Sequence, residues 1–140
     1  MTVNAEYLHL KSGAALPALW VPPPFRAVVV AETAVPPQWQ SEVSDWLVRA
    51  GCLYMMAWGE NCSSWDDAVD MANLEQFDFG EIPREQFVMT TWHEHDALEE
   101  VFRFAKNSAV HPAARLDGTL LLHIAPGGDE LRLMEVFFNA

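Results

Sequence analysis

Residues 25–31 have the sequence FRAVVVA, a run rich in β-branched valine in which Arg26 is the one polar residue. A run without polar alternation is typical of a strand that is covered on both faces of a parallel sheet. Three further runs of this kind follow along the chain, with the sequences CLYMMAW (residues 52–58), FVMTTW (87–92) and TLLLHI (119–124). The sequence therefore predicts four strands of a buried, mainly parallel sheet.

Amphipathic helices are predicted between these strands. The first opens at Pro36, because proline is tolerated in the first turn of a helix, and it stops before Gly51. The second is expected to begin at Ser63 or Ser64, and the third follows Asp96, which is a candidate cap. Each strand–helix–strand unit crosses over right-handed and covers one face of the sheet. We therefore expect an α/β fold: a single three-layer sandwich with a mainly parallel four-stranded sheet and helices on both faces.

The whole chain, residues 1–140, is expected to form one domain. Residues 1–24 are interpreted as an extended lead-in that includes a short strand candidate at 7–10, and residues 25–125 form the core. Residues 126–140 could be a C-terminal helix or an edge strand, and the spacing of their apolar residues favours the helix. Seven strand residues should be almost inaccessible to solvent: Val28, Val30, Leu53, Met55, Val88, Leu121 and Ile124.

Composition excludes several classes of function. The formal net charge is −12, so contact with nucleic acid or an anionic membrane would begin with repulsion. No apolar stretch approaches the roughly 18 residues of a membrane span. Two cysteines cannot form a disulfide framework, which favours a cytoplasmic protein, and no motif calls for a cofactor.

One hypothesis makes the chain a small hydrolase or transferase, since ligands of parallel sheets bind at the carboxyl ends of the strands. Cys62, at a predicted helix start, would be the nucleophile, His93 its base, and Glu94 or Asp66 the group that orients the histidine. Against this catalytic reading, nearby carboxylates oppose formation of a thiolate.

Two other groups of residues at the predicted strand ends are candidates for a metal site and for an acid and base pair. His93 and His95 alternate on an extended segment and could share a metal ion, but a long-range ligand pattern is missing, so no metal site is predicted. Glu32, Glu60 and Glu94 could meet across the strand ends as an acid and base pair. Solvated loop charge is the preferred explanation of these carboxylates, because the sequence gives no distance between them. His123, within an apolar strand, is interpreted as a core histidine with its hydrogen bonds satisfied.

The distribution of charge is more specific than these clusters. Residues 60–100 contain twelve acidic residues and a single base, Arg84, and so carry −11 of the total charge of −12. Aromatic residues are interspersed among the acids. Charge accelerates encounter with an oppositely charged partner, and aromatic side chains supply buried contact energy. The pattern predicts an interaction face made from Trp65, Asp66, Asp67, Asp70 and Trp92. The ordinary surface of a soluble, acidic cytosolic protein is the alternative explanation of the same charges.

Three segments, WGENCSSWDD (58–67), TWHE (91–94) and TLLLHI (119–124), resemble a group of small, acidic, uncharacterised bacterial proteins known as a domain of unknown function. The resemblance spans roughly residues 25–125. It implies a bacterial, cytoplasmic protein and assigns no activity, cofactor or site residue.

The preferred functional hypothesis is therefore a small acidic interaction domain of the inhibitor, immunity or accessory-subunit type that binds a basic protein. The alternative is the enzyme with its site around Cys62, Asp66, His93 and Glu94. If these four side chains line one cleft, the enzyme is favoured. An exposed apolar patch ringed by carboxylates would favour the binding protein.

Overall fold

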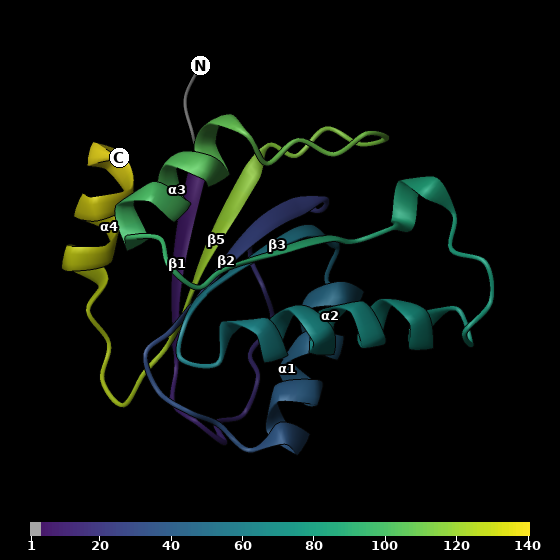
Figure 1. Ribbon diagram of the computed structural model, residues 1–140, viewed down its shortest axis with the longest axis horizontal. Coiled ribbons are helices and arrows are strands. Elements are labelled where there is room, and N and C mark those ends of the chain that lie inside the picture. Colours follow the sequence, from purple (N-terminus) through teal and green to yellow (C-terminus); the bar gives the residue numbers. More distant parts are fainter. Residues whose placement is uncertain (1–3) are drawn as a thin grey trace.

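A computed structural model describes residues 4–140 as a five-stranded parallel sheet between two layers of helices (Figure 1). The strand order is β1-β5-β2-β3-β4. The strands are β1 (Asn4–Leu10), β2 (Phe25–Ala31), β3 (Cys52–Gly59), β4 (Met89–His93) and β5 (Gly118–Ile124). The helices are α1 (Pro37–Arg49), α2 (Cys62–Gln76), α3 (Leu98–Asn107) and α4 (Glu130–Asn139), with a short 3-10 turn η1 (Arg84–Gln86).

The predicted fold class is confirmed. Helices α1 and α2 pack on one face of the sheet, and α3 and α4 cover the other (Figure 1). All seven strand residues predicted to be inaccessible are buried. His123 is also buried and hydrogen-bonded, as expected of a core histidine.

The sheet has one strand more than predicted, because the segment interpreted as a lead-in contains β1. This strand pairs with β5 along its whole length, from Asn4 opposite Gly118 to Leu10 opposite Ile124. The candidate at residues 7–10 is its second half. Only Leu10 is fully buried, since β1 is an edge strand, and this explains why its apolar signal is weak. The C-terminal segment is a helix, α4, as favoured.

Two local boundaries differ from the expected ones. Helix α2 begins at Cys62, one residue before the earliest predicted start, after Asn61 in a left-handed conformation with φ of 54°. Helix α3 is preceded by Ala97 at the cap position, because the carboxylate of Asp96 bonds to His93 instead of to the helix.

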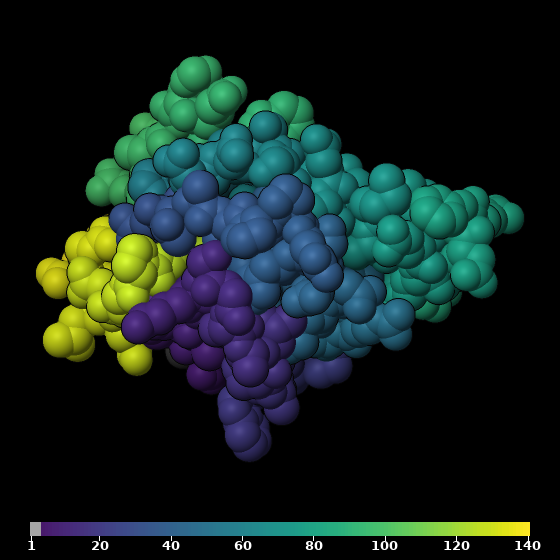
Figure 2. Space-filling model, turned by 90° about the horizontal axis from the view of Figure 1, so that it is seen from below, coloured from purple at the N-terminus to yellow at the C-terminus, as the bar shows by residue number. Residues whose placement is uncertain are grey.

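The strand order creates a topological switch point between β2 and β5. These strands are neighbours, but the chain leaves β2 toward α1 on one face and leaves β5 toward α4 on the other (Figure 1). In open parallel sheets such a divergence opens a crevice at the carboxyl ends of the strands. At the opposite side of the molecule, the segment between α2 and β4 projects from the body (Figure 2).

Candidate functional site: the carboxyl edge and the α2–β4 face

An open pocket lies where β2, β3 and β4 end. Its volume is about 500 Å³, and four carboxylates contribute to its lining. Glu32 follows β2, Glu60 follows β3, and Glu94 and Asp96 follow β4. Three of these are the carboxylates whose meeting across the strand ends was considered from the sequence. A pocket lined in this way has the charge to receive a cationic group.

Backbone contacts hold the acidic pocket in shape. Gly59 has φ of +99°, and a Cβ atom there would lie 2.1 Å from the carbonyl oxygen of Ala31, so no other residue fits. The close approach lets the backbone N–H of Glu60 donate to the same oxygen at 2.7 Å. On the far side of the pocket, the indole N–H of Trp58 donates to the carbonyl oxygen of Asp96 at 2.8 Å.

A buried polar network lies beside this pocket at the switch point. His123 Nε2 donates to Glu32 Oε1 at 2.5 Å, and His123 Nδ1 lies 2.7 Å from the Tyr7 hydroxyl. Arg132, on α4, donates to the same oxygen of Glu32 at 2.9 Å. The backbone N–H of Asp129 donates to the Tyr7 oxygen at 2.9 Å. The network therefore connects β1, β5, β2 and the first turn of α4.

The hydrogen bonds of this network fix the charge of Glu32. The Tyr7 oxygen accepts from the backbone N–H of Asp129 and shares a second hydrogen bond with His123 Nδ1. Burial alone would raise the pKa of Glu32, but hydrogen bonds from His123 and Arg132 outweigh it and hold that pKa below its ordinary value. Burial raises the pKa of Tyr7. Glu32 is thus kept ionised at the rim of the pocket.

The four residues of the enzyme hypothesis do not share one cleft. His93 is hydrogen-bonded to Asp96 through Nδ1 and to Thr91 through Nε2, each at 2.9 Å, and it packs against Phe104 of α3. Cys62 lies in the first turn of α2, on the opposite face of the sheet, and is only 3% exposed. Of the four residues only Glu94 lines the acidic pocket. The structure therefore does not supply Cys62 with His93 as a base.

Asp66 is buried within the acidic segment. Its side chain points inward from α2, and its Oδ2 atom has no hydrogen-bond partner in the described part of the chain. Burial and the nearby charge of Asp70 raise the pKa of Asp66 from 3.8 to about 6. Thr90 of β4 donates to Asp70 at 2.8 Å, which ties this cluster to the edge of the sheet. Asp66 is thus an internal acid and does not belong to the surface predicted from the sequence.

An exposed apolar surface with carboxylates runs along α2 and the edge strand β4. We call it the α2–β4 face and define it by Asp67, Asp70, Met71, Leu74, Phe87 and Trp92, all exposed. The four helical members recur at spacings of three and four, so they lie on one side of α2. Trp65 is 1% exposed and packs in the core. Its predicted role as a surface anchor is therefore wrong, because helical periodicity points it inward, with Val69 and Ala72.

A groove of about 400 Å³ lies within this face. Its lining comes from α2 and β4 and from the segment that joins them, and it includes Leu74, Phe87, Ile82 and Met89. Asp70, Asn73 and Thr90 add its polar groups. The groove is mainly apolar, and Asp70 contributes a carboxylate to its lining.

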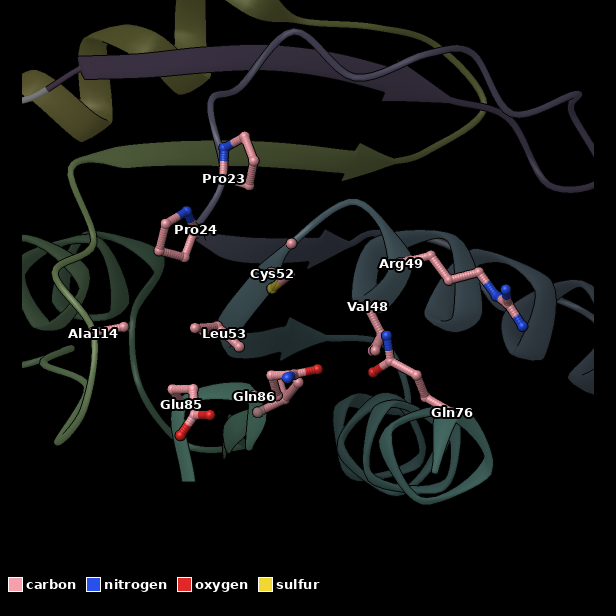
Figure 3. A pocket seen from close by; sticks show the side chains of 12 residues that line it. Pro23, Pro24, Val48, Arg49, Cys52, Leu53, Gln76, Glu85, Gln86 and Ala114 are labelled. Atoms are coloured by element: carbon pink, nitrogen blue, oxygen red, sulfur yellow. The ribbon is translucent and has the colours of Figure 1, made fainter. Parts of the chain in front are cut away.

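A separate cavity of about 340 Å³ lies at the amino ends of β2 and β3 (Figure 3). Pro23 and Pro24 lie on one side of it, and Glu85 and Gln86 of η1 lie on the other. Cys52 contributes to the lining, and burial raises the pKa of its thiol to about 12. None of the sequence-predicted site residues lines this cavity.

Both cysteines should react slowly with iodoacetamide at pH 7. Cys52 and Cys62 are buried and unpaired, and the Cys52 thiol is protonated at this pH. Alkylation needs an exposed thiolate, so we expect both to be modified only when the chain opens. Mass spectrometry of the native and urea-unfolded protein measures the two rates. Fast native alkylation of Cys62, lost in His93→Ala, would restore the cysteine enzyme hypothesis.

The described residues also limit two other classes of site. No three Asp, Glu, His or Cys side chains among residues 4–140 are placed to hold a metal ion. No helix in the same range is both long enough and apolar enough to cross a membrane.

Comparison with known proteins assigns a family without an activity. A family model described as "Domain of unknown function (DUF7684)" matches residues 5–140. No curated protein and no solved structure matches the chain. The match covers nearly the whole sequence, including the acidic pocket, the network around His123 and the α2–β4 face. The chain therefore belongs to the DUF7684 family of domains of unknown function.

Proposed function

We propose that this protein is an interaction domain that binds a basic protein through the α2–β4 face, as an inhibitor, an immunity protein or an accessory subunit does. The observation that carries the proposal is the groove between α2 and β4, where exposed Leu74 and Phe87 meet the carboxylate of Asp70. Apolar side chains held open to water cost free energy, and a partner that covers them recovers it.

Charge supports a basic partner in particular. Eleven of the twelve excess negative charges belong to residues 60–100, which include α2 and β4. Exposed carboxylates on this side, such as Asp67 and Asp70, attract a basic surface over about 8 Å at physiological ionic strength. The acidic pocket at the adjoining strand ends extends the same field and would receive a lysine or arginine side chain.

The four residues of the enzyme hypothesis do not line one cleft, and this supports a binding function over a catalytic one. Catalysis by Cys62 needs a base within hydrogen-bond reach. His93 lies on the opposite face of the sheet from Cys62 and is hydrogen-bonded to Thr91 and Asp96. We also propose a cytoplasmic location and a bacterial source. Two unpaired cysteines are stable as thiols in a reducing compartment, and the acidic composition matches the resemblance noted from the sequence.

Reversing charge on the α2–β4 face should slow association with the partner. We expect Asp67→Lys with Asp70→Lys to lower the association rate constant about tenfold or more and to change dissociation less. Both side chains are exposed, so the fold should persist. The partner is first captured from the source cell with the tagged full-length protein, and surface plasmon resonance then measures both rate constants at several salt concentrations.

Glu42→Lys with Glu135→Lys provides the matched control. It changes the net charge equally, at exposed positions on α1 and α4. If both pairs slow association equally, only overall charge matters and the face is not the interface. Binding that does not depend on salt would also contradict the proposal.

A further inference from the structure

The edge strand β4 is open to pairing. Within residues 4–140 it pairs only with β3, in parallel register from Tyr54 opposite Met89 to Trp58 opposite His93. Strand pairing uses both sides of the backbone, so one side of β4 presents N–H and C=O groups without a strand to bond to. The other edge strand, β1, has the loop of residues 17–21 beside it, where Glu6 and this loop line one small cavity.

The sequence of β4 lacks the charged residues and prolines with which natural proteins block a sheet edge. Its five residues are MTTWH, with no lysine, proline, glycine or carboxylate. Pairing of β3 and β4 proceeds without a bulge. Thr90, Thr91 and Trp92 are residues that favour extended conformations. Trp92 is 52% exposed, and Phe87, just before the strand, is 47% exposed. The edge is thus short, but another strand can pair with it.

Side-chain sites for an added strand lie directly beside this edge. The groove of about 400 Å³ contains Met89 and Thr90 of β4 together with Leu74 and Phe87, so it can take an apolar side chain. Asp70 at its margin can pair with a cation. Side chains on one face of a strand recur every second residue, so a segment with basic and apolar residues on that face would satisfy both features.

We propose that the partner adds an extended segment, rich in lysine or arginine and in aliphatic residues, to the edge of β4 as a sixth strand of the sheet. This inference rests on the proposed function and specifies the partner's binding element. A second copy of this chain is a poor occupant, because it would bring two acidic segments of charge −11 together.

The test uses 15N-labelled full-length protein and, as probe, a blocked peptide of about nine residues, long enough to span β4. Lysine and valine take turns at its odd-numbered positions, which share one face of a strand, and threonine fills the even-numbered positions. Two further peptides carry N-methyl groups on alternate amides, one peptide for each register. If the peptide adds as a strand, the NMR signals of the β4 amides should shift. The peptide whose N-methyl groups point away from β4 should still bind, and the peptide whose N-methyl groups point toward β4 should bind at least about tenfold more weakly. Equal binding by both registers, no binding, or shifts away from β4 would overturn the proposal.

A pair of tryptophan variants supplies the side-chain control. Trp92→Ala should weaken peptide binding at least about fivefold, because Trp92 lies on the receiving edge. Trp20→Ala removes an even more exposed indole, at 87% exposure, from the loop beside β1 and should leave binding unchanged. Equal effects would contradict strand addition. If the captured partner binds with salt dependence but leaves the exchange of the β4 amides unchanged, this inference fails and the proposed function stands.

Discussion

Leu121→Ala should lower the free energy of unfolding by about 2–5 kcal/mol. Leu121 lies in β5, between β1 and β2, and is fully buried. The substitution removes apolar area from the core and leaves a cavity that close-packed strands on both sides cannot collapse. Urea denaturation followed by circular dichroism gives the free energies for the two proteins.

Leu131→Ala is the matched control for this prediction. Leu131 is on α4 and is 85% exposed, so we expect its substitution to change stability by less than about 0.5 kcal/mol. A loss below about 1 kcal/mol for Leu121→Ala would mean that Leu121 is not part of the hydrophobic core.

Asp66→Asn should stabilise the protein at pH 7.5 by about 1–3 kcal/mol, on the scale of 1.36 kcal/mol per pKa unit. Burial and Asp70 raise the folded pKa of Asp66 from 3.8 to about 6. The folded state therefore binds the proton more tightly than the unfolded state. The contribution of Asp66 to the free energy of unfolding is therefore fully present below pH 3.8. It is lost as pH rises through about 6, because the buried carboxyl of the folded protein must then ionise.

The pH dependence separates this effect from a simple change in packing. The difference in unfolding free energy between Asp66→Asn and the unmodified protein should be small near pH 4 and should grow between about pH 4 and 6. Asp67→Asn, at the exposed neighbouring position, should show no such growth. A difference that is constant with pH would mean that Asp66 titrates normally in the folded protein.

The fold was predictable because the strongest sequence signals come from its most buried parts. Residues 25–31 and 119–124 are largely apolar runs, and they form β2 and β5, two interior strands of the sheet. Strand β1 was only half predicted, since an edge strand alternates polar and apolar residues and gives a weaker pattern. Its partner β5 lies more than 100 residues away, so pairing between them leaves no local signature.

The candidate site was less predictable, because it depends on distances across the sheet. Glu32, Glu60 and Glu94 are correctly placed at strand ends by their positions after apolar runs, and they do line one pocket. Cys62 follows β3 and His93 is the last residue of β4, but Cys62 lies in α2 on one face of the sheet and His93 packs against α3 on the other. The partners of His123 were missed, since Tyr7 and Arg132 lie in the two terminal segments, whose structure was least clear. A histidine within an apolar strand was the only signal for that network.

Amide hydrogen exchange of the full-length protein, alone and in complex with its captured partner, shows whether the partner binds at the α2–β4 face. We expect slower exchange in the complex for amides of β4 and for those around the groove between α2 and β4, with no change around the cavity near Cys52. Protection concentrated at that cavity or on α4, with the α2–β4 face unchanged, would contradict this expectation.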